Sequence, residues 1–225
     1  MHILAFDTST EYCSVALWRD GTVFEREIHA GQRHSQLLLG MVDEVLREGG
    51  VALDRLDGIA YGEGPGTFTG LRIACAVTQG LAFAADLRVA GVSTLLALAV
   101  GAGADRVVCC LDARMQQVYY GAYERTPAGW AVAHAAALYH PSEVPGLAGS
   151  GWVGCGSGFA AYGDVLSQRY GGQIVQVYPD AFPRARHVAE LARPVFVAGA
   201  AASPDTAAPC YIRDKVALKT NERAT

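Results

Sequence analysis

The chain has 225 residues, of which 51% are hydrophobic and 18% are charged. This length allows one large domain or two small ones, and the composition lies far from that of disordered chains. The 22 acidic and 18 basic residues give a net charge of −4, which mildly repels a phosphate backbone. Tight binding of nucleic acid by the chain alone is therefore not expected.

Targeting and cysteine signals predict a cytoplasmic protein with no membrane segment. Met1 leads directly into apolar residues and Asp7, without the basic region and cleavage site of a secretory signal. The longest uncharged stretch, residues 144–163, carries seven glycines and a proline, too many for a stable helix in lipid. Cysteines occur at positions 13, 75, 109, 110, 155 and 210 without a C-x-x-C pair, and they are expected to be reduced core thiols.

The first half of the chain alternates strand and helix patterns. Strands are expected at 3–7, 13–17, 23–28, 56–61 and 89–92, and helices at 35–48, 71–85 and 94–100. Asp20-Gly21 is typical of a tight turn between strands. The helix at 35–48 has a wide apolar stripe, whereas the helix at 71–85 is apolar almost all round, which is typical of a helix buried on two sides.

The second half repeats this pattern. Strands are expected at 107–111, 118–123, 130–138 and 174–178, and helices at 159–170 and 185–192. Asp7 and Asp112 follow the first strand of each half, and the order in both halves is read as strand, Asp turn, strand, strand, helix, strand, helix.

This repetition predicts two copies of one α/β unit, each a mixed sheet flanked by helices. The small-residue linker at 101–104 places the boundary between an N-terminal domain at 1–103 and a C-terminal domain at 104–225. The tail after about residue 215 is expected to be disordered.

The turns after the two aspartates leave two interpretations open. In the duplicated ribonuclease-H-like fold of actin, Hsp70 and the sugar kinases, this Asp is followed by glycines whose amides approach nucleotide phosphates. Asp7 and Asp112 match the aspartates, but the turns at 8–10 and 113–115 contain no glycine. The pair therefore marks either a nucleotide site, vestigial in this chain, or a structural role in which Asp7 hydrogen-bonds its own turn.

A glycine-rich loop at 62–70 separates a strand from a helix, a position that favours an anion. The loop lacks the Gly-Lys-Ser/Thr ending of a P-loop, and threonines stand where a dinucleotide fingerprint has glycine. We therefore interpret it as a tight connection whose glycines allow close packing and whose helix is capped by Thr69.

Catalytic and metal-binding patterns are missing from the sequence. Histidines occur at positions 2, 29, 34, 134, 140 and 187, with neither an H-x-x-x-H nor an H-E-x-x-H spacing. No G-x-S-x-G nucleophile elbow occurs. The sequence therefore predicts no catalytic residue, no metal and no cofactor in this chain.

The helices at 35–48 and 71–85 carry more apolar area than one sheet face can cover. Ala76 and Gly80 add a strip of small residues that permits close approach of another helix. These features predict a protein partner, and the alternative is that both helices are covered within the monomer.

Several segments together resemble the TsaB (YeaZ) family, the bacterial partner protein in forming threonylcarbamoyladenosine at position 37 of tRNA. They are residues 4–10, 34–38, 64–73, 92–95, 111–114 with 118–119, and 211–213. The Gly-Pro-Gly-Thr-Phe-Thr-Gly segment at 64–70 is the most specific of them. Gly40, where the family often has Pro, and Ala74, where Gly is frequent, depart from the pattern.

The resemblance implies an actin-like (ASKHA) two-domain fold and a non-catalytic scaffold role. The related catalytic subunit, TsaD, carries an H-x-x-x-H metal motif, whereas the comparable stretch here, residues 91–97, has no histidine. The family also implies that the ATPase TsaE joins the complex, that ATP and metal belong to the partner proteins, and that tRNA is contacted only through the complex. The same helices can also pair two copies of the chain as an isologous homodimer.

The resemblance and the apolar helices together predict a docking interface for TsaD. Its expected residues are His34, Leu37, Leu38, Met41, Val45, Arg72, Ile73, Ala76 and Gly80. Glutamate in place of Leu38 or Ile73 is expected to separate the two proteins. The rival interpretations are an ATPase or kinase that uses Asp7 and Asp112, and a metallopeptidase of the kind that the old "glycoprotease" label of this superfamily implies.

Overall fold

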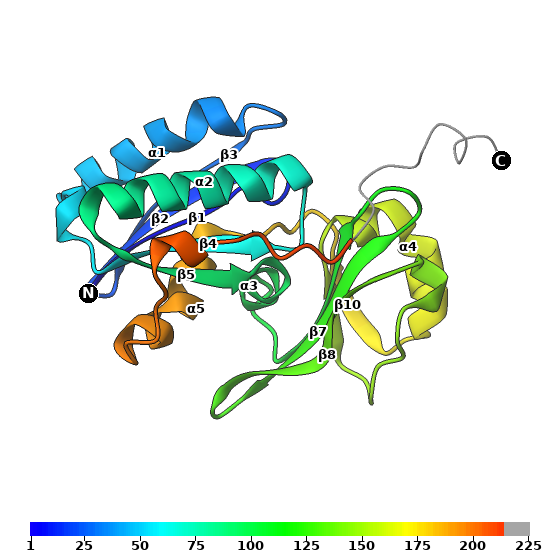
Figure 1. The fold of residues 1–225 in the computed structure, drawn as a ribbon. Helices are drawn as coiled ribbons and strands as arrows, with labels where there is room; N and C mark the ends of the chain where they lie inside the picture. Colours follow the sequence, from blue (N-terminus) through cyan, green and yellow to red (C-terminus); the bar gives the residue numbers. More distant parts are fainter. Residues whose placement is uncertain (214–225) are drawn as a thin grey trace.

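The computed structural model describes residues 1–213, which form two five-stranded sheets with helices on their faces (Figure 1). The first half contains β1 (His2–Asp7), β2 (Tyr12–Arg19), β3 (Thr22–His29), α1 (His34–Gly49), η1 (Leu53–Arg55), β4 (Gly58–Gly64), α2 (Phe68–Ala85), β5 (Arg88–Ser93) and α3 (Thr94–Gly101). The second half contains β6 (Arg106–Asp112), β7 (Val118–Thr126), β8 (Gly129–Tyr139), η2 (Pro141–Glu143), β9 (Trp152–Cys155), α4 (Ser157–Tyr170), β10 (Ile174–Tyr178), α5 (Ala185–Val197) and η3 (Pro204–Thr206). The predicted disordered tail lies outside the described residues.

The two sheets have the same strand order. The first is β3-β2-β1-β4-β5, and the second, taken from its opposite edge, is β8-β7-β6-β9-β10. In each sheet the first strand pairs antiparallel with the second and parallel with the fourth. The predicted duplicated α/β architecture with mixed sheets is therefore confirmed.

One strand of the second half was missed by the sequence prediction. β9 lies inside the uncharged stretch at 144–163, and its four residues are all buried, so the alternation typical of a half-buried strand is lost. Gly154 allows α4 to approach, because a Cβ there would lie 2.7 Å from Cζ of Phe159. Because β9 precedes α4, this helix corresponds to α2, and η2 with its following loop occupies the place of α1. The predicted order of the second half was wrong at this point.

The helices form layers around the two sheets (Figure 1). α1 packs on β2 and α2 packs on β4, on one face of the first sheet, while α5 covers β1 and β2 from the other face. α4 covers one face of the second sheet. α3 lies between the sheets, where Leu95 and Leu98 pack against Val107 and Cys109 of β6. The junction of the two halves is thus part of the core.

The final helix returns to the first sheet. Val188 and Ala192 of α5 pack against Ile3 of β1. Arg184 and Arg186 form ion pairs of 3.4 and 3.0 Å with Glu27 and Glu25 of β3. The boundary at 101–104 remains a prediction, and the chain from α5 onward contacts the half that precedes it.

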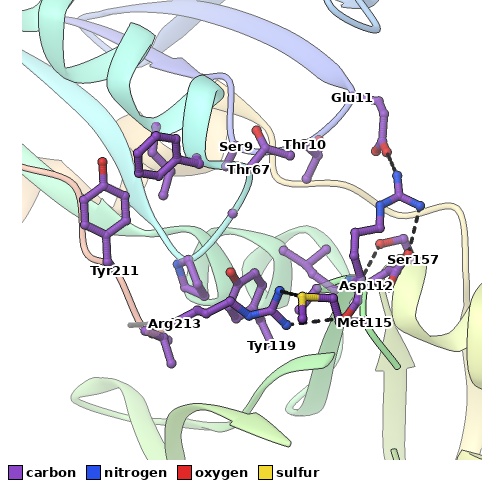
Figure 2. A pocket seen from close by; sticks show the side chains of 18 of the residues that line it. Ser9, Thr10, Glu11, Thr67, Asp112, Met115, Tyr119, Ser157, Tyr211 and Arg213 are labelled. Atoms are coloured by element: carbon purple, nitrogen blue, oxygen red, sulfur yellow. Dashed lines mark hydrogen bonds and ion pairs between the residues drawn. The ribbon is translucent and has the colours of Figure 1, made fainter. Parts of the chain in front are cut away.

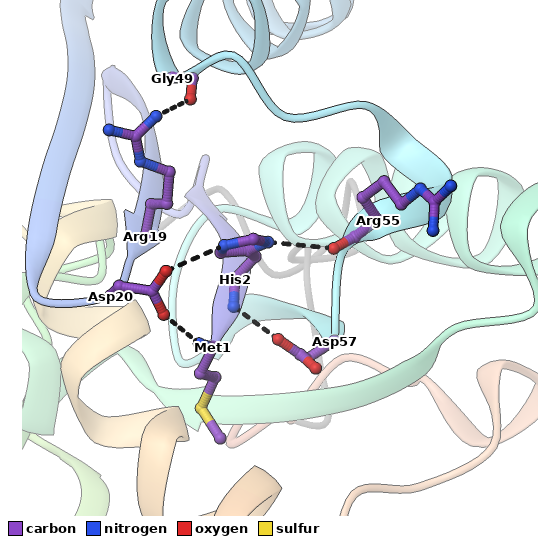
Figure 3. Close-up of polar contacts among 7 residues, drawn as sticks. All are labelled: Met1, His2, Arg19, Asp20, Gly49, Arg55 and Asp57. Carbon is purple, nitrogen blue, oxygen red and sulfur yellow. Dashed lines mark hydrogen bonds and ion pairs between the residues drawn. The ribbon is translucent and has the colours of Figure 1, made fainter.

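Polar contacts fix the N-terminal end of β1 (Figure 3). The N-terminal amine forms an ion pair with Asp20 in the β2–β3 turn, and the His2 amide donates to Oδ2 of Asp57 at 2.6 Å. Hydrogen bonds from the amine and from His2 hold the pKa of Asp20 below its usual value. These contacts join β1 to the turn on one side and to the start of β4 on the other.

Candidate docking surface and interdomain cleft

A cleft of about 620 Å³ lies between the two halves. It is formed by the β1–β2 turn, the loop before α2, the β6–β7 turn, the first turn of α4 and the segment that ends at Arg213 (Figure 2). Its polar lining residues include Ser9, Thr10, Glu11, Thr67, Asp112, Tyr119, Ser157, Tyr211 and Arg213. The cleft therefore lies where the first two strands of both units turn.

Asp7 is buried beneath this cleft and is only 1% exposed. Its Oδ1 accepts hydrogen bonds from the amide and the hydroxyl of Ser9, at 2.9 and 2.6 Å. Its Oδ2 packs against Gly62 and has no hydrogen-bond partner among the described residues. Burial raises the pKa of Asp7 from 3.8 to about 6. This geometry favours the structural interpretation, in which Asp7 hydrogen-bonds its own turn.

The buried Asp7 carboxyl is expected to make stability depend on pH. Because folding raises its pKa from 3.8 to about 6, the folded state holds the proton more tightly, and stability falls as pH rises through this window. A shift of about two pKa units corresponds to about 3 kcal/mol. In urea titrations, Asp7→Asn is expected to exceed the wild type at pH 8 and to lie close to it at pH 3.5. A gain of equal size at both pH values would contradict this assignment.

Asp112 lines the cleft, but its carboxylate is already paired with Arg114. Oδ1 accepts from the Arg114 amide at 2.8 Å, and Oδ2 lies 3.1 Å from Nη1 of Arg114. Nη2 of the same guanidinium lies 3.0 Å from Oε1 of Glu11 in the first half. Within residues 1–213, no three histidine, cysteine, aspartate or glutamate side chains form a group that could hold a metal ion.

The glycine-rich loop packs directly on the turn that follows β1. The Thr67 amide donates to the Ser9 carbonyl, and the Thr8 hydroxyl donates to the Gly70 carbonyl, both at 2.7 Å. A Cβ at Gly66 or Gly70 would lie 2.5 or 1.9 Å from the carbonyl oxygen of Ser9 or Thr8. These distances confirm a tight connection whose glycines are required by packing.

The predicted cap of the following helix was wrong by two residues. α2 begins at Phe68, and the residue at its N-cap is Thr67, which has extended backbone angles. Thr69 therefore lies inside the first turn.

The structure divides the predicted interface residues into two groups. His34, Leu38, Met41 and Val45 of α1 are buried in the monomer, Leu38 and Val45 completely. Their assignment to a partner surface is corrected here, because the first sheet already covers Leu38, Met41 and Val45, and Nε2 of His34 lies 3.2 Å from the Tyr12 carbonyl oxygen. Leu37 is half-buried.

α2 contributes the exposed part of the prediction. Arg72, Ala76 and Gly80 are exposed and Ile73 is half-buried. Phe83, which the sequence analysis did not single out, is 62% exposed. Its spacing could have identified it, since positions 72, 76, 80 and 83 follow one stripe of a helix. We call the five residues Arg72, Ile73, Ala76, Gly80 and Phe83 the α2 face.

The α2 face is apolar over most of the helix length. The sequence has no charged residue between Arg72 and Asp86. Of the described helices, only α2 is long and apolar enough, by length and composition, to cross a membrane. In the structure 33% of its residues are buried. Ala74 and Cys75 pack it onto the first sheet, as in a core helix of a globular protein. The remaining surface is an exposed apolar helix face.

Two sheets of identical order, an aspartate at the end of the first strand of each, and a cleft between them define a duplicated ribonuclease-H-like protein of the actin-like class. YeaZ from Pseudomonas aeruginosa has this structure, with a TM-score of 0.86 and 39% identity over 93% of this chain and 99% of that one. A second solved structure, of a P. aeruginosa protein described as similar to the peptidase YeaZ, gives a TM-score of 0.87 at 39% identity, covering 94% of this chain and 99% of that one.

The sequence relatives agree with the structural ones. The TsaB protein of Escherichia coli is 39% identical over 97% of both chains, and that of Haemophilus influenzae is 34% identical over 96% of this chain and 95% of its own. The chain belongs to the TsaB (YeaZ) family. Residues 27–219 also match the family model of TsaD, the tRNA N6-adenosine threonylcarbamoyltransferase.

Proposed function

We propose that this chain is the non-catalytic partner subunit of a complex that makes N6-threonylcarbamoyladenosine in tRNA, and that it binds the catalytic subunit TsaD through the α2 face. The observation that carries the proposal is an exposed helix face, uncharged from Ile73 to Ala85, on a chain similar to TsaB proteins over nearly its full length. The ATPase TsaE joins the same complex, in the cytoplasm.

The cleft supports a role without chemistry of its own. Asp7 is buried under Ser9, and Asp112 is engaged by Arg114, so neither carboxylate is free for a metal-bound nucleotide. We infer that ATP and metal act on the partner proteins. The net charge of −4 favours tRNA contact through the assembled complex. An ATPase, kinase or peptidase function gains no support from this geometry.

The α2 face has the properties of a docking helix. The small side chains at positions 76 and 80 let a second helix approach closely, and Phe83 supplies an exposed aromatic ring beside them. At the other end of the face, the Arg72 guanidinium lies over the Phe68 ring, 3.8 Å from its centroid. Its positive charge marks the N-terminal end of the face. Aromatic side chains and arginines are enriched at the centres of protein interfaces, where most of the binding energy is concentrated. Because the face is apolar, the same face on a second copy of the chain could pack against it. It would therefore also join two copies in the absence of TsaD.

Ala76→Glu tests the proposed interface. The side chain is exposed, so the fold should change in stability by less than about 0.5 kcal/mol. A carboxylate buried without a partner in the complex should weaken binding to the cognate TsaD at least 100-fold, about 2.7 kcal/mol. Isothermal titration calorimetry measures this loss.

Ala133→Glu is the matched control, because Ala133 is exposed on β8 of the second sheet. It should bind TsaD like the wild type. Wild-type affinity of Ala76→Glu would exclude the α2 face as the interface.

A further inference from the structure

The turn between β6 and β7 has an unusual backbone. Arg114, Met115 and Gln116 have φ values of 60°, 54° and 57°, so three consecutive residues with side chains adopt the left-handed conformation. This conformation is costly for residues other than glycine and persists where surrounding contacts impose it. The turn also contains Arg114 of the Leu-Asp-Ala-Arg segment, whose ion pair with Glu11 the proposed function does not use.

Two contacts, one from Glu11 and one from Arg213, hold this turn from across the cleft. Nη2 of Arg114 lies 3.0 Å from Oε1 of Glu11 in the β1–β2 turn. Nη2 of Arg213 donates to Oε1 of Gln117 at 2.6 Å and lies 3.4 Å from the carbonyl oxygen of Arg114. Arg114 thus reaches across the cleft to the first half, and Arg213, near the end of the chain, reaches the turn from the other side of the cleft.

Arg213 is carried by a segment that is attached to the first half. We call residues 207–213 the strap. Gln79 of α2 donates to the Ala207 carbonyl at 3.0 Å, the Ala208 amide donates to the Tyr61 hydroxyl at 3.0 Å, and the Cys210 amide donates to the Glu63 carbonyl at 2.7 Å. The strap is therefore fixed to β4 and α2 before it extends Arg213 to the turn.

The strap also touches the α2 face. Nε of Arg72 donates to the Tyr211 hydroxyl at 2.8 Å, and the Tyr211 ring stacks on Phe68 with centroids 5.4 Å apart. A contact that displaces Arg72 therefore acts on the residue two positions before Arg213.

We propose that residues 113–117 form a two-state latch across the cleft, left-handed while Glu11 and Arg213 hold it and relaxed when the strap moves. The Arg114–Glu11 pair is exposed and the Arg213–Gln117 hydrogen bond is only partly buried, so the latch is weakly held and a partner can shift it. Binding at the α2 face would reach the latch through Arg72, Tyr211 and Arg213, and this coupling alone rests on the proposed function.

Hydrogen exchange of the isolated full-length chain tests the latch without a partner, so its outcome is independent of whether TsaD binds. Two amides report on the turn, because Ala113 donates to the Gln117 carbonyl at 2.9 Å and Gln117 donates to the Arg114 carbonyl at 3.0 Å. Arg213→Ala is expected to speed exchange of both amides at least tenfold in NMR measurements. Arg106→Ala, which removes an ion pair with Glu124 in the same sheet, should leave them within twofold.

A second variant separates the latch from a general loss of structure. Glycine adopts a φ of 54° without cost, so Met115→Gly should slow exchange in the Arg213→Ala background at least threefold. Exchange within twofold of the wild type in Arg213→Ala, or faster exchange on adding Met115→Gly, would overturn the proposal.

Discussion

Gly70→Ala is expected to destabilise this protein by about 3 kcal/mol or more, whereas Gly80→Ala in the same helix should stabilise it. A Cβ at Gly70 would lie 1.9 Å from the Thr8 carbonyl oxygen, a backbone atom that cannot rotate away. The Thr8 hydroxyl donates to the Gly70 carbonyl, so the two segments are joined where the methyl group would separate them. Overpacking of this kind commonly costs about 1–3 kcal/mol and more where the backbone must move.

Gly80 provides the control because a Cβ there meets open space among the described residues. Alanine in an exposed helix interior is worth about 0.5–1 kcal/mol relative to glycine. Midpoints of guanidinium unfolding measure both effects. If the two variants shifted the midpoint in the same direction, the close packing of α2 on the β1–β2 turn would be wrong.

Leu38→Ala is the second change with a large expected effect, and its neighbour Leu39 is the matched control. Leu38 is fully buried against the first sheet, whereas Leu39 is 54% exposed on the same helix. Removing a buried leucine side chain typically costs about 2–5 kcal/mol, and an exposed one less than about 0.5 kcal/mol. Thermal and urea unfolding distinguish the two.

The burial of Leu38 also corrects the expectation that Leu38→Glu would act by separating the chain from TsaD. A carboxylate at a fully buried position should unfold α1 from the sheet instead. If Leu38→Glu stayed folded and lost only TsaD binding, the original assignment of Leu38 to the TsaD interface would be correct.

The duplication could be predicted from the sequence because it rests on local signals. Hydrophobic runs that end in Asp7 and Asp112, and the same succession of strands after each, need no knowledge of distant contacts. β9 lacked such a signal, since four fully buried residues among glycines show no period. Periodicity also located the apolar stripe of α1 without telling whether the sheet or a partner covers it.

The cleft contacts could not be predicted at all. Arg114 and Glu11 are 103 positions apart, and Arg72 and Tyr211 are 139 apart. Polar side chains at such separations carry no pattern in a single sequence, and only the return of the chain from α5 to the first sheet brings the strap to α2. The glycines at 66 and 70 were recognised as a packing signal, but their contact with the β1–β2 turn required the structure.

The threonylcarbamoyladenosine content of tRNA in cells depleted of this protein tests the central claim most directly. Wild-type chain and Ala133→Glu, supplied from a plasmid, should restore the modified nucleoside, whereas Ala76→Glu at equal protein level should not. Full restoration by Ala76→Glu would contradict the assignment of the α2 face, and failure of the wild type to restore the nucleoside would contradict the proposed function itself.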